Sequence, residues 1–366
     1  MELQFATDYS TILKKIDQID PLKYGRTRNF VDGAITYLSP YISRGVISTR
    51  QVLESVLAKG YKIQEIESFV KELCWRDYFQ RVGQVKNLNQ EIKQAQFPVS
   101  NHEIPISVLE GNTGIMGIDA AIHQLYRNGY MHNHCRMYTA SLVCNIGKSH
   151  WLQPAQWLYY HLLDGDWASN SCSWQWVAGA NSSKKYYANQ ENINKYTKTY
   201  QVNTYLDKTY EALEIAETPT ALTATQKFTP QTELSLASEI QLDSEIPTFI
   251  YNYYNLDPLW HAKEKGNRIL LIEPDIFTSY PVSKACIDFM LALSKNIPGI
   301  QIYVGSFQSL VNQYHLEDIY YKEHPLNIGY TGTRDSRDWN AEDVTGYYPS
   351  FFSYWKKVEK HLYKSV

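Results

Sequence analysis

The sequence of 366 residues lacks the features that define several protein classes. It has no run of 18 apolar residues, so no membrane-spanning helix is predicted. Its five cysteines form no CxxC pair, which argues against a disulfide framework, a zinc site and an iron–sulfur cluster. The first twenty residues lack the basic and apolar regions of a signal peptide. The expected compartment is therefore a reducing cytoplasm.

Aromatic residues are abundant and unevenly spread, with 30 Tyr, 9 Trp and 12 Phe. Five of the nine tryptophans lie between Trp151 and Trp176. Such a cluster can be ordinary core, or it can stack on flat ligands and pass electrons. Charge is also uneven, because residues 1–200 carry a net +4 and residues 201–366 a net −7. The mildly basic first part permits a nucleic-acid partner without requiring one.

Hydrophobic periodicity predicts a mainly α chain with a small α/β unit at its end. Helices are predicted over 8–20, 49–59, 63–82, 119–128, 131–145 and 154–163, with 164–176 as a loop leading into a short element. Residues 268–274, 300–307 and 318–325 are short β-type runs separated by helical segments, which predicts a small parallel sheet. An aromatic helix is expected in the tail, over 346–363. The predicted domains are a helical 1–205, a linker or irregular segment at 206–246, and an α/β unit at 247–366.

Four polar segments are candidates for a site. Glu72, Trp75, Arg76 and Phe79 share one helix face by their spacing, although a surface Glu–Arg pair beside a half-buried Trp has the same pattern. The second segment, Met131 to Met137, places Asn133, Arg136 and Met137 on one face. An arginine there can hold a buried carboxylate or an anionic ligand, or can lie at the surface. His132 and His134 have no third ligand nearby, so no metal site is predicted.

The other two segments carry carboxylates and hydroxyls. Asp164 and Asp166 flank Gly165 after an apolar helix, so they can bind a metal, exchange protons or accept hydrogen bonds, or simply cap the next helix. Thr36, Tyr37, Leu38 and Ser39 precede Pro40, where hydroxyls and backbone N–H groups at a helix start can hold phosphate. This last signal is weak, because Ser and Thr before Pro are common in turns.

Taken in order, these segments resemble the FAD-binding domain of the DNA photolyase/cryptochrome family over about residues 20–200. The matching stretches are LSPYISRGVIS (38–48), ELCWRDYF (72–79), TGIMGIDAAIHQLYRNGYMHNHCRMYTAS (113–141) and HLLDGDWASNSCSWQW (161–176). The resemblance implies an all-helical domain that buries a U-shaped FAD. The residues implied on the pyrophosphate side are Tyr24, Thr36, Tyr37, Leu38 and Ser39.

The resemblance also implies the flavin end of that site. Arg136 and Asp164 would form an ion pair beside the isoalloxazine, and Gly165 and Asp166 would meet its polar edge. Asn170 would face the flavin N5, where enzymes that repair cyclobutane dimers carry Asn. Trp174 and Trp151 match the two members of the family's tryptophan electron-transfer chain that lie nearest the flavin. The third member has no match, and Phe97 is the aromatic residue nearest to its place.

The implied substrate is DNA that contains pyrimidine dimers, in single or double strands. The residues that match the lesion pocket are Glu72, Trp75, Asn133, Met137 and Trp176, while Arg76, Lys184 and Lys185 would meet phosphates. Glu72 would hydrogen-bond the pyrimidine and steady its radical anion. The function expected is light-driven dimer repair, by a deoxyribodipyrimidine photo-lyase. The alternative is a cryptochrome-like blue-light receptor or a flavin redox protein without repair activity.

The sequence departs from the family pattern in several places. His134 and Cys135 lie inside the MHN motif where basic and apolar residues are usual, and Tyr130 stands before it in place of Trp. The family's N-terminal α/β antenna domain has no counterpart before the FAD-domain match, so no second antenna chromophore is expected. The β-α-β-α-β segment at 268–326 is similar in order to part of that domain moved to the C-terminal side, or it is an unrelated small unit.

Overall fold

The computed structural model describes residues 3–234 and 239–363, which form two compact units built from non-contiguous segments. Of the described residues, the first unit contains Leu3, Asp20–Ile35 and Tyr78–Pro230, and the second contains Gln4–Ile19, Thr36–Asp77, 231–234 and 239–363. Helix α5 (Glu67–Gly83) contributes residues to both. The predicted domains, with boundaries at 205 and 246, are contiguous ranges of the sequence rather than such assemblies of segments, and they stay a prediction.

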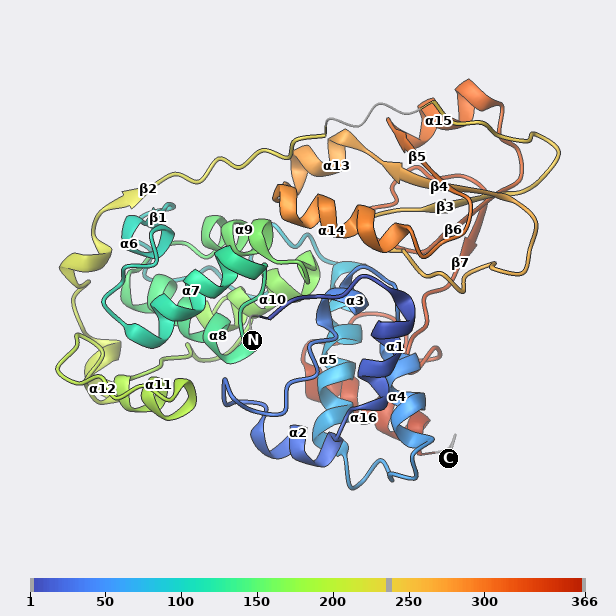
Figure 1. Ribbon diagram of the computed structural model, residues 1–366. Coiled ribbons are helices and arrows are strands. Elements are labelled where there is room, and N and C mark those ends of the chain that lie inside the picture. The colour runs from blue at the N-terminus through green and yellow to red at the C-terminus, as the bar shows by residue number, and fades with distance from the viewer. Residues whose placement is uncertain (1–2, 235–238, 364–366) are drawn as a thin grey trace. The chain divides into compact units, whose positions relative to one another are not determined.

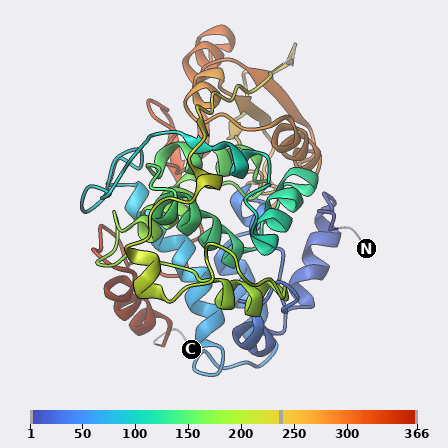
Figure 2. The same cartoon turned by 90° about the vertical axis from the view of Figure 1, so that its left-hand side faces the viewer.

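The regular secondary structure of the first unit is almost all helical, with long loops between the helices (Figures 1 and 2). Its helices are α2 (Pro21–Thr27), α6 (Ile106–Leu109), α7 (Met116–Asn128), α8 (Asn133–Ser141), the π-helix η1 (Leu142–Ile146), α9 (Leu152–His161), α10 (Trp167–Ala178), α11 (Gln190–Thr197), α12 (Tyr210–Glu214) and the 3₁₀ turn η2 (Thr220–Leu222). Strands β1 (Ile104–Pro105) and β2 (Thr225–Gln226) form a small antiparallel pair. α7 ends as predicted at Gly129, whose φ of 68° suits glycine.

The middle of the first unit is filled by large aromatic side chains. Three of them are essentially fully buried: Trp151 just before α9, Trp157 on α9 and Trp174 on α10. The buried Asn145 in η1 donates to the carbonyls of Val177 and Tyr186, at 3.0 and 2.8 Å, so the π-helical turn is tied to the end of α10. Most of the tryptophan cluster is thus core of this unit.

The second unit combines helices with a parallel sheet (Figure 1), so the chain as a whole is a mixed α/β protein and the prediction of a mainly α chain is confirmed only in part. The strands are β3 (Thr248–Tyr251), β4 (Asn267–Ile272), β5 (Ile300–Val304), β6 (Ile319–Lys322) and β7 (Thr333–Asp335). Their order is β5-β4-β3-β6-β7, and every neighbouring pair is parallel. The helices are α1 (Tyr9–Asp17), α3 (Ser39–Ser43), α4 (Thr49–Leu57), α13 (Pro274–Ser279), α14 (Lys284–Ser294), α15 (Phe307–Tyr314) and α16 (Phe351–Leu362).

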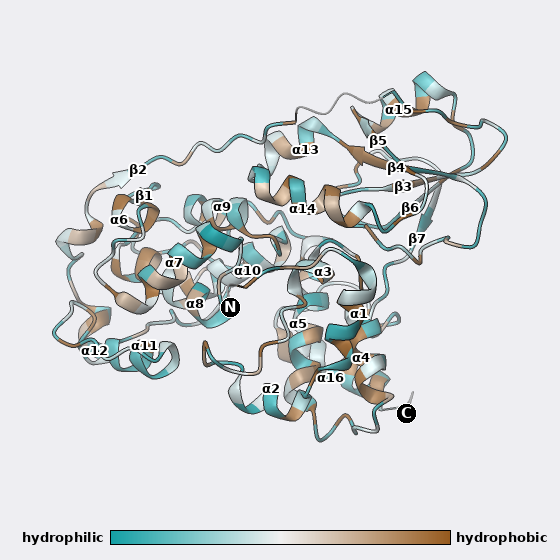
Figure 3. Cartoon of the chain, in the orientation of Figure 1, coloured by the Kyte–Doolittle hydropathy of each residue, from teal (hydrophilic) through white to brown (hydrophobic). Residues whose placement is uncertain are grey.

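The sheet contains the three predicted strand runs and two further strands. β4 is hydrophobic after its first two residues (Figure 3), and Ile269 and Leu271 belong to a buried cluster with Ile250 of β3. β3, which the periodicity did not predict, lies at the centre of the sheet. Of the described helices, none combines the length and the apolar character that crossing a lipid bilayer requires.

Candidate functional site

An arginine and a buried carboxylate meet in the first unit. Nη2 of Arg136, on α8, lies 3.0 and 2.8 Å from the two carboxylate oxygens of Asp164, which precedes α10. The Nε of Arg136 donates to the carbonyl of Met131 at 2.8 Å. The guanidinium also lies 5.5 Å from the ring centroid of Tyr130, within cation–π range. The Asp164 side chain is only 4% exposed, so the pair places a fixed positive charge on a largely buried carboxylate.

The second carboxylate of the segment begins a helix. Asp166 is the N-cap of α10, and its Oδ1 accepts from the backbone N–H of Ser169 at 2.8 Å. Its Oδ2 accepts from the Nε2 of Gln80 at 2.5 Å. The prediction of a loop over 164–176 was therefore wrong beyond Asp166, and the capping alternative was right. Gly165 is buried, and a Cβ there would lie 2.9 Å from the carbonyl oxygen of Leu162, which favours glycine.

One stripe of α10 carries further predicted residues. Asp166, Asn170 and Trp174 follow one another at four-residue intervals, so they share one side of the helix. The Nδ2 of Asn170 donates to the carbonyl of Ala155 on α9 at 2.8 Å, which fixes its amide orientation. Trp151 is fully buried. Sequence reasoning missed Gln80, whose only signal is its position on α5.

The predicted lesion residues of the first unit are more accessible. Asn133 begins α8 and is exposed, Met137 is half-buried, and Trp176 on α10 is 40% exposed. The ring of Trp176 lies 5.9 Å from that of Tyr186. Tyr24, expected on the phosphate side, is half-buried in α2. These positions suit contacts with a ligand, and their roles stay predictions.

The two histidines of the MHN motif have structural contacts. His132 caps α8 by accepting from the backbone N–H of His134 through Nδ1. Burial, together with the positive charges of His134 and Arg136, lowers the pKa of His132 to about 4. Within the described residues, no group of three His, Cys, Asp or Glu side chains is arranged to hold a metal.

The predicted phosphate segment lies in the second unit. Tyr37 has a φ of 53°, in the left-handed region, and the carbonyl of Leu38 accepts from the backbone N–H groups of Tyr41 and Ile42 as α3 begins. Leu38 is buried, while Thr36 and Ser39 are half-buried. The proposed role of this segment in binding the pyrophosphate stays a prediction.

Trp75 has an aromatic partner that sequence reasoning did not foresee. In the second unit its ring stacks on Phe351 of α16, with centroids 3.8 Å apart and planes inclined by 9°. Phe351 in turn stacks on Trp355. Arg76 donates from Nη2 to the hydroxyl of Ser43 at 2.7 Å, and Glu72 is half-buried. One face of the predicted lesion-contacting tryptophan is thus covered by the chain's own tail helix, and the cluster YYPSFFSYW was its only sequence signal.

The polar groups in the first unit fit an isoalloxazine. Such a ring has acceptor oxygens, ring N–H groups and, when reduced, a negative charge. Arg136 supplies a fixed cation, while Asp166 and Asn170 supply an acceptor and an amide along one helix stripe.

The chain is similar to one protein family and to several known proteins. Residues 69–252 match the family described as the FAD binding domain of DNA photolyase. The deoxyribodipyrimidine photo-lyase of Buchnera aphidicola is 28% identical over 240 residues, which cover 62% of this chain and 47% of that protein. Cryptochrome DASH of Ostreococcus tauri is 30% identical over 220 residues, covering 57% of this chain and 39% of that one. A crystal structure of a Synechocystis cryptochrome aligns with a TM-score of 0.47 and 25% identity, over 53% of this chain and 44% of that chain.

The chain spans less than half the length of each of these three proteins. The family match nevertheless covers half of the present sequence, and it includes Arg136, Asp164, Asp166 and Asn170. The protein therefore belongs to the family of DNA photolyase FAD-binding domains.

Proposed function

We propose that the protein uses FAD and blue light to repair cyclobutane pyrimidine dimers in DNA. The observation that carries this proposal is the polar cluster of the first unit: the Arg136–Asp164 pair together with Asp166 and Asn170 on α10. Relatives named deoxyribodipyrimidine photo-lyase support the same reading. A bound, reduced FAD would supply light absorption and one-electron donation, and the protein would position it and tune its charge.

The residues of the first unit would divide this task. Arg136 would keep a positive charge beside the ring, because a guanidinium does not lose its proton at neutral pH and Asp164 fixes its position. Asp166 would accept hydrogen bonds through a carboxylate whose orientation α10 and Gln80 determine. Asn170 would present an amide held by Ala155. The buried indoles of Trp174 and Trp151 would shield the site from water and carry electrons to it.

Further residues are proposed for the DNA side. A dimer must leave the base stack to reach a buried cofactor, which is the base-flipping strategy named for photolyases. Glu72 would accept a hydrogen bond from a pyrimidine, and Trp75 and Trp176 would stack on bases. Asn133 and Met137 of the first unit are also proposed to contact the DNA, while Arg76, Lys184 and Lys185 would meet phosphates. We also propose that FAD is the only chromophore, which extraction of the bound pigments would test.

A second function, light sensing or flavin redox chemistry without repair, is favoured by one specific observation. Phe351 covers a face of Trp75, the residue proposed to stack on a flipped base. A relative named cryptochrome DASH fits this alternative. Repair requires that a flipped base replace Phe351 on the ring of Trp75, whereas light sensing does not.

The deciding experiment is a repair assay. Protein with chemically reduced flavin is illuminated with blue light in the presence of dimer-containing oligonucleotides, in single and double strands. Loss of dimers that requires light and falls in Glu72→Gln, but not in the control Glu67→Gln on the same helix, supports repair. Binding of FAD with no repair by the unaltered protein would overturn it and leave the sensing alternative.

A further inference from the structure

A histidine and a tyrosine of the first unit form a pair that takes no part in the proposed flavin site. Nε2 of His134, on α8, lies 3.4 Å from the phenol oxygen of Tyr186, within hydrogen-bonding reach. The other ring nitrogen, Nδ1, lies 3.1 Å from the backbone carbonyl oxygen of Asn29. Because a carbonyl only accepts, Nδ1 carries a proton, and Nε2 of the neutral ring is left as an acceptor. The phenol of Tyr186 therefore donates to His134.

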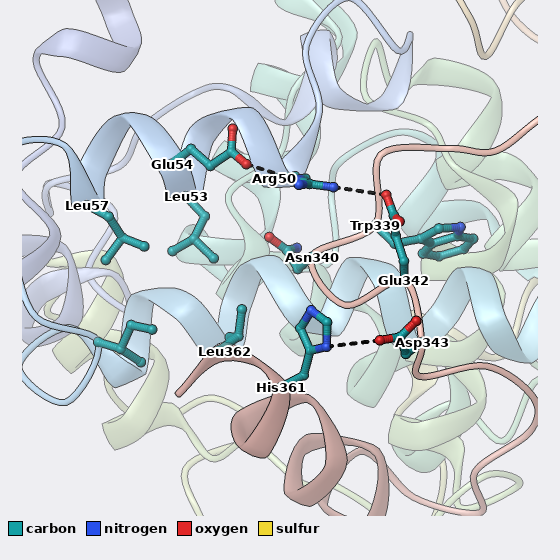
Figure 4. A pocket seen from close by; sticks show the side chains of 11 residues that line it. Arg50, Leu53, Glu54, Leu57, Trp339, Asn340, Glu342, Asp343, His361 and Leu362 are labelled. Carbon is teal, nitrogen blue, oxygen red and sulfur yellow. Dashed lines mark hydrogen bonds and ion pairs between the residues drawn. The ribbon is translucent and has the colours of Figure 1, made fainter. Parts of the chain in front are cut away.

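The surroundings of His134 keep its ring neutral at pH 7. Burial lowers the pKa of His134, and the charge of Arg28 lowers it further, against an opposing effect of the hydrogen bond to Asn29. His361 of the second unit has a different kind of partner, since its Nδ1 lies 3.7 Å from the carboxylate of Asp343 beside a cavity (Figure 4). The ring of His134 is bonded instead to a carbonyl and a phenol, so its acceptor nitrogen is directed at a tyrosine.

Tyr186 connects this base to an accessible indole. The ring centroid of Tyr186 lies 5.9 Å from that of Trp176 on α10, and Trp176 is 40% exposed. Two rings this close can exchange an electron. Tyr186 itself is half-buried, and burial raises the pKa of its hydroxyl. A phenol that loses an electron becomes a strong acid, so a base within hydrogen-bonding reach is needed to take its proton, and His134 is placed to do so.

We propose that Tyr186 and His134 form a proton-coupled redox pair that restores Trp176 after a one-electron oxidant has removed an electron from its indole. The radical cation of Trp176 takes one electron from Tyr186, and the O–H proton of Tyr186 passes to Nε2 of His134. The O–H bond breaks and an N–H bond forms. The products are the neutral indole, a neutral tyrosyl radical and an imidazolium, so electrons, protons and charge balance.

The oxidant belongs to the class of nucleobase radical cations. Trp176 is proposed to stack on bases, so a positive charge on a base reaches this indole directly. Transfer of that charge to Tyr186 protects the indole from irreversible reaction with oxygen or water. This use of the pair rests on the proposed function, whereas the redox chemistry of the pair does not.

Oxidation of the full-length protein in the dark tests the pair without flavin photochemistry or DNA. Azide radicals, which oxidise tryptophan by one electron, serve as the probe, and peptide mass spectrometry measures the stable oxidation products of Trp176. Tyr186→Phe removes only a hydroxyl and is expected to raise these products severalfold. His134→Gln is expected to do the same, because an amide can hydrogen-bond the phenol but is not a base. Tyr187→Phe removes the hydroxyl of the next, also half-buried residue and is expected to leave the yield unchanged.

Absorption after a short pulse of azide radicals follows the step itself. The unaltered protein is expected to show a phase in which indole radical decays as tyrosyl radical forms, more slowly in D₂O than in H₂O. Tyr186→Phe should lose this phase, and His134→Gln should slow it about tenfold or more, as removal of a general base does. Equal oxidation of Trp176 in the unaltered protein and in Tyr186→Phe would overturn the pair, and an effect of Tyr186→Phe without one of His134→Gln would overturn the role of His134. Failure of dimer repair would change neither readout.

Discussion

The Arg136–Asp164 pair offers a quantitative test of how the first unit holds its proposed site. Asp164→Asn keeps the shape of the side chain and removes its charge. Nη2 of Arg136 lies 2.8 Å from Oδ2 of Asp164, and the two side chains are 22% and 4% exposed. Removing one partner of a fully buried pair costs about 3–5 kcal/mol. Because water reaches part of Arg136, we expect about 2–3 kcal/mol for Asp164→Asn.

A double-mutant cycle separates the pair from its surroundings. The variants are Asp164→Asn, Arg136→Met and both together, and hydrogen exchange of the amides in α8 and α10 reports the stability of the first unit itself. We expect the double variant to be less destabilised than the sum of the single variants, by about 1–2 kcal/mol of coupling. Both single variants should also retain less FAD after purification. If each single variant lost less than about 0.5 kcal/mol, if the two losses added up in the double variant, and if FAD content were unchanged, the pair would not stabilise the first unit or its proposed site.

Three further predictions address the same chain. Burial lowers the pKa of His132 and of His161 to about 4 in the native state. Between about pH 6.5 and pH 4 the unfolded state therefore binds more protons than the native state, and the free energy of unfolding falls as the pH drops through this range. The loss approaches about 3 kcal/mol for each histidine, and urea unfolding at pH 7 and at pH 4.5 measures it. Glu72→Gln should lower dimer repair at least tenfold with FAD still bound, in single-turnover illumination. Phe351→Leu should uncover Trp75 and tighten binding to dimer-containing DNA about three- to tenfold, because an aromatic pair contributes about 0.5–1.5 kcal/mol. Fluorescence anisotropy measures this affinity, and an unchanged value would mean that Trp75 does not contact DNA.

The sequence predicted those elements whose signals are local. Ser48 was expected to cap a helix, and its hydroxyl accepts from the backbone N–H of Gln51 at 3.0 Å at the start of α4. Gly129 was expected to end a helix, and it does so in the left-handed conformation. The strands β4, β5 and β6 were predicted because each lies in a short β-type run, separated from the next by a helical segment.

Features that depend on distant partners were missed or misread. β3 is only four residues long and is stabilised by pairing with β4 and β6 on either side, so four residues of periodicity could not reveal it. The segment after Asp166 has Ser169, Asn170 and Ser171 in its first turns, residues with modest helix propensity, yet α10 forms because its other positions are buried. Tertiary packing, which the local pattern does not contain, decided both cases.

The contact between Trp75 and Phe351 is the strongest example, because it joins residues 276 positions apart. The spacing of Glu72, Trp75 and Arg76 correctly placed them on one helix, but it left open what that face meets. Stacking by Phe351 gives the indole an intramolecular partner, so any base that stacks on the same face must offset the loss of that contact. The affinity of dimer-containing DNA for Phe351→Leu, compared with the unaltered protein, therefore separates repair from sensing more directly than the presence of FAD, which both functions require.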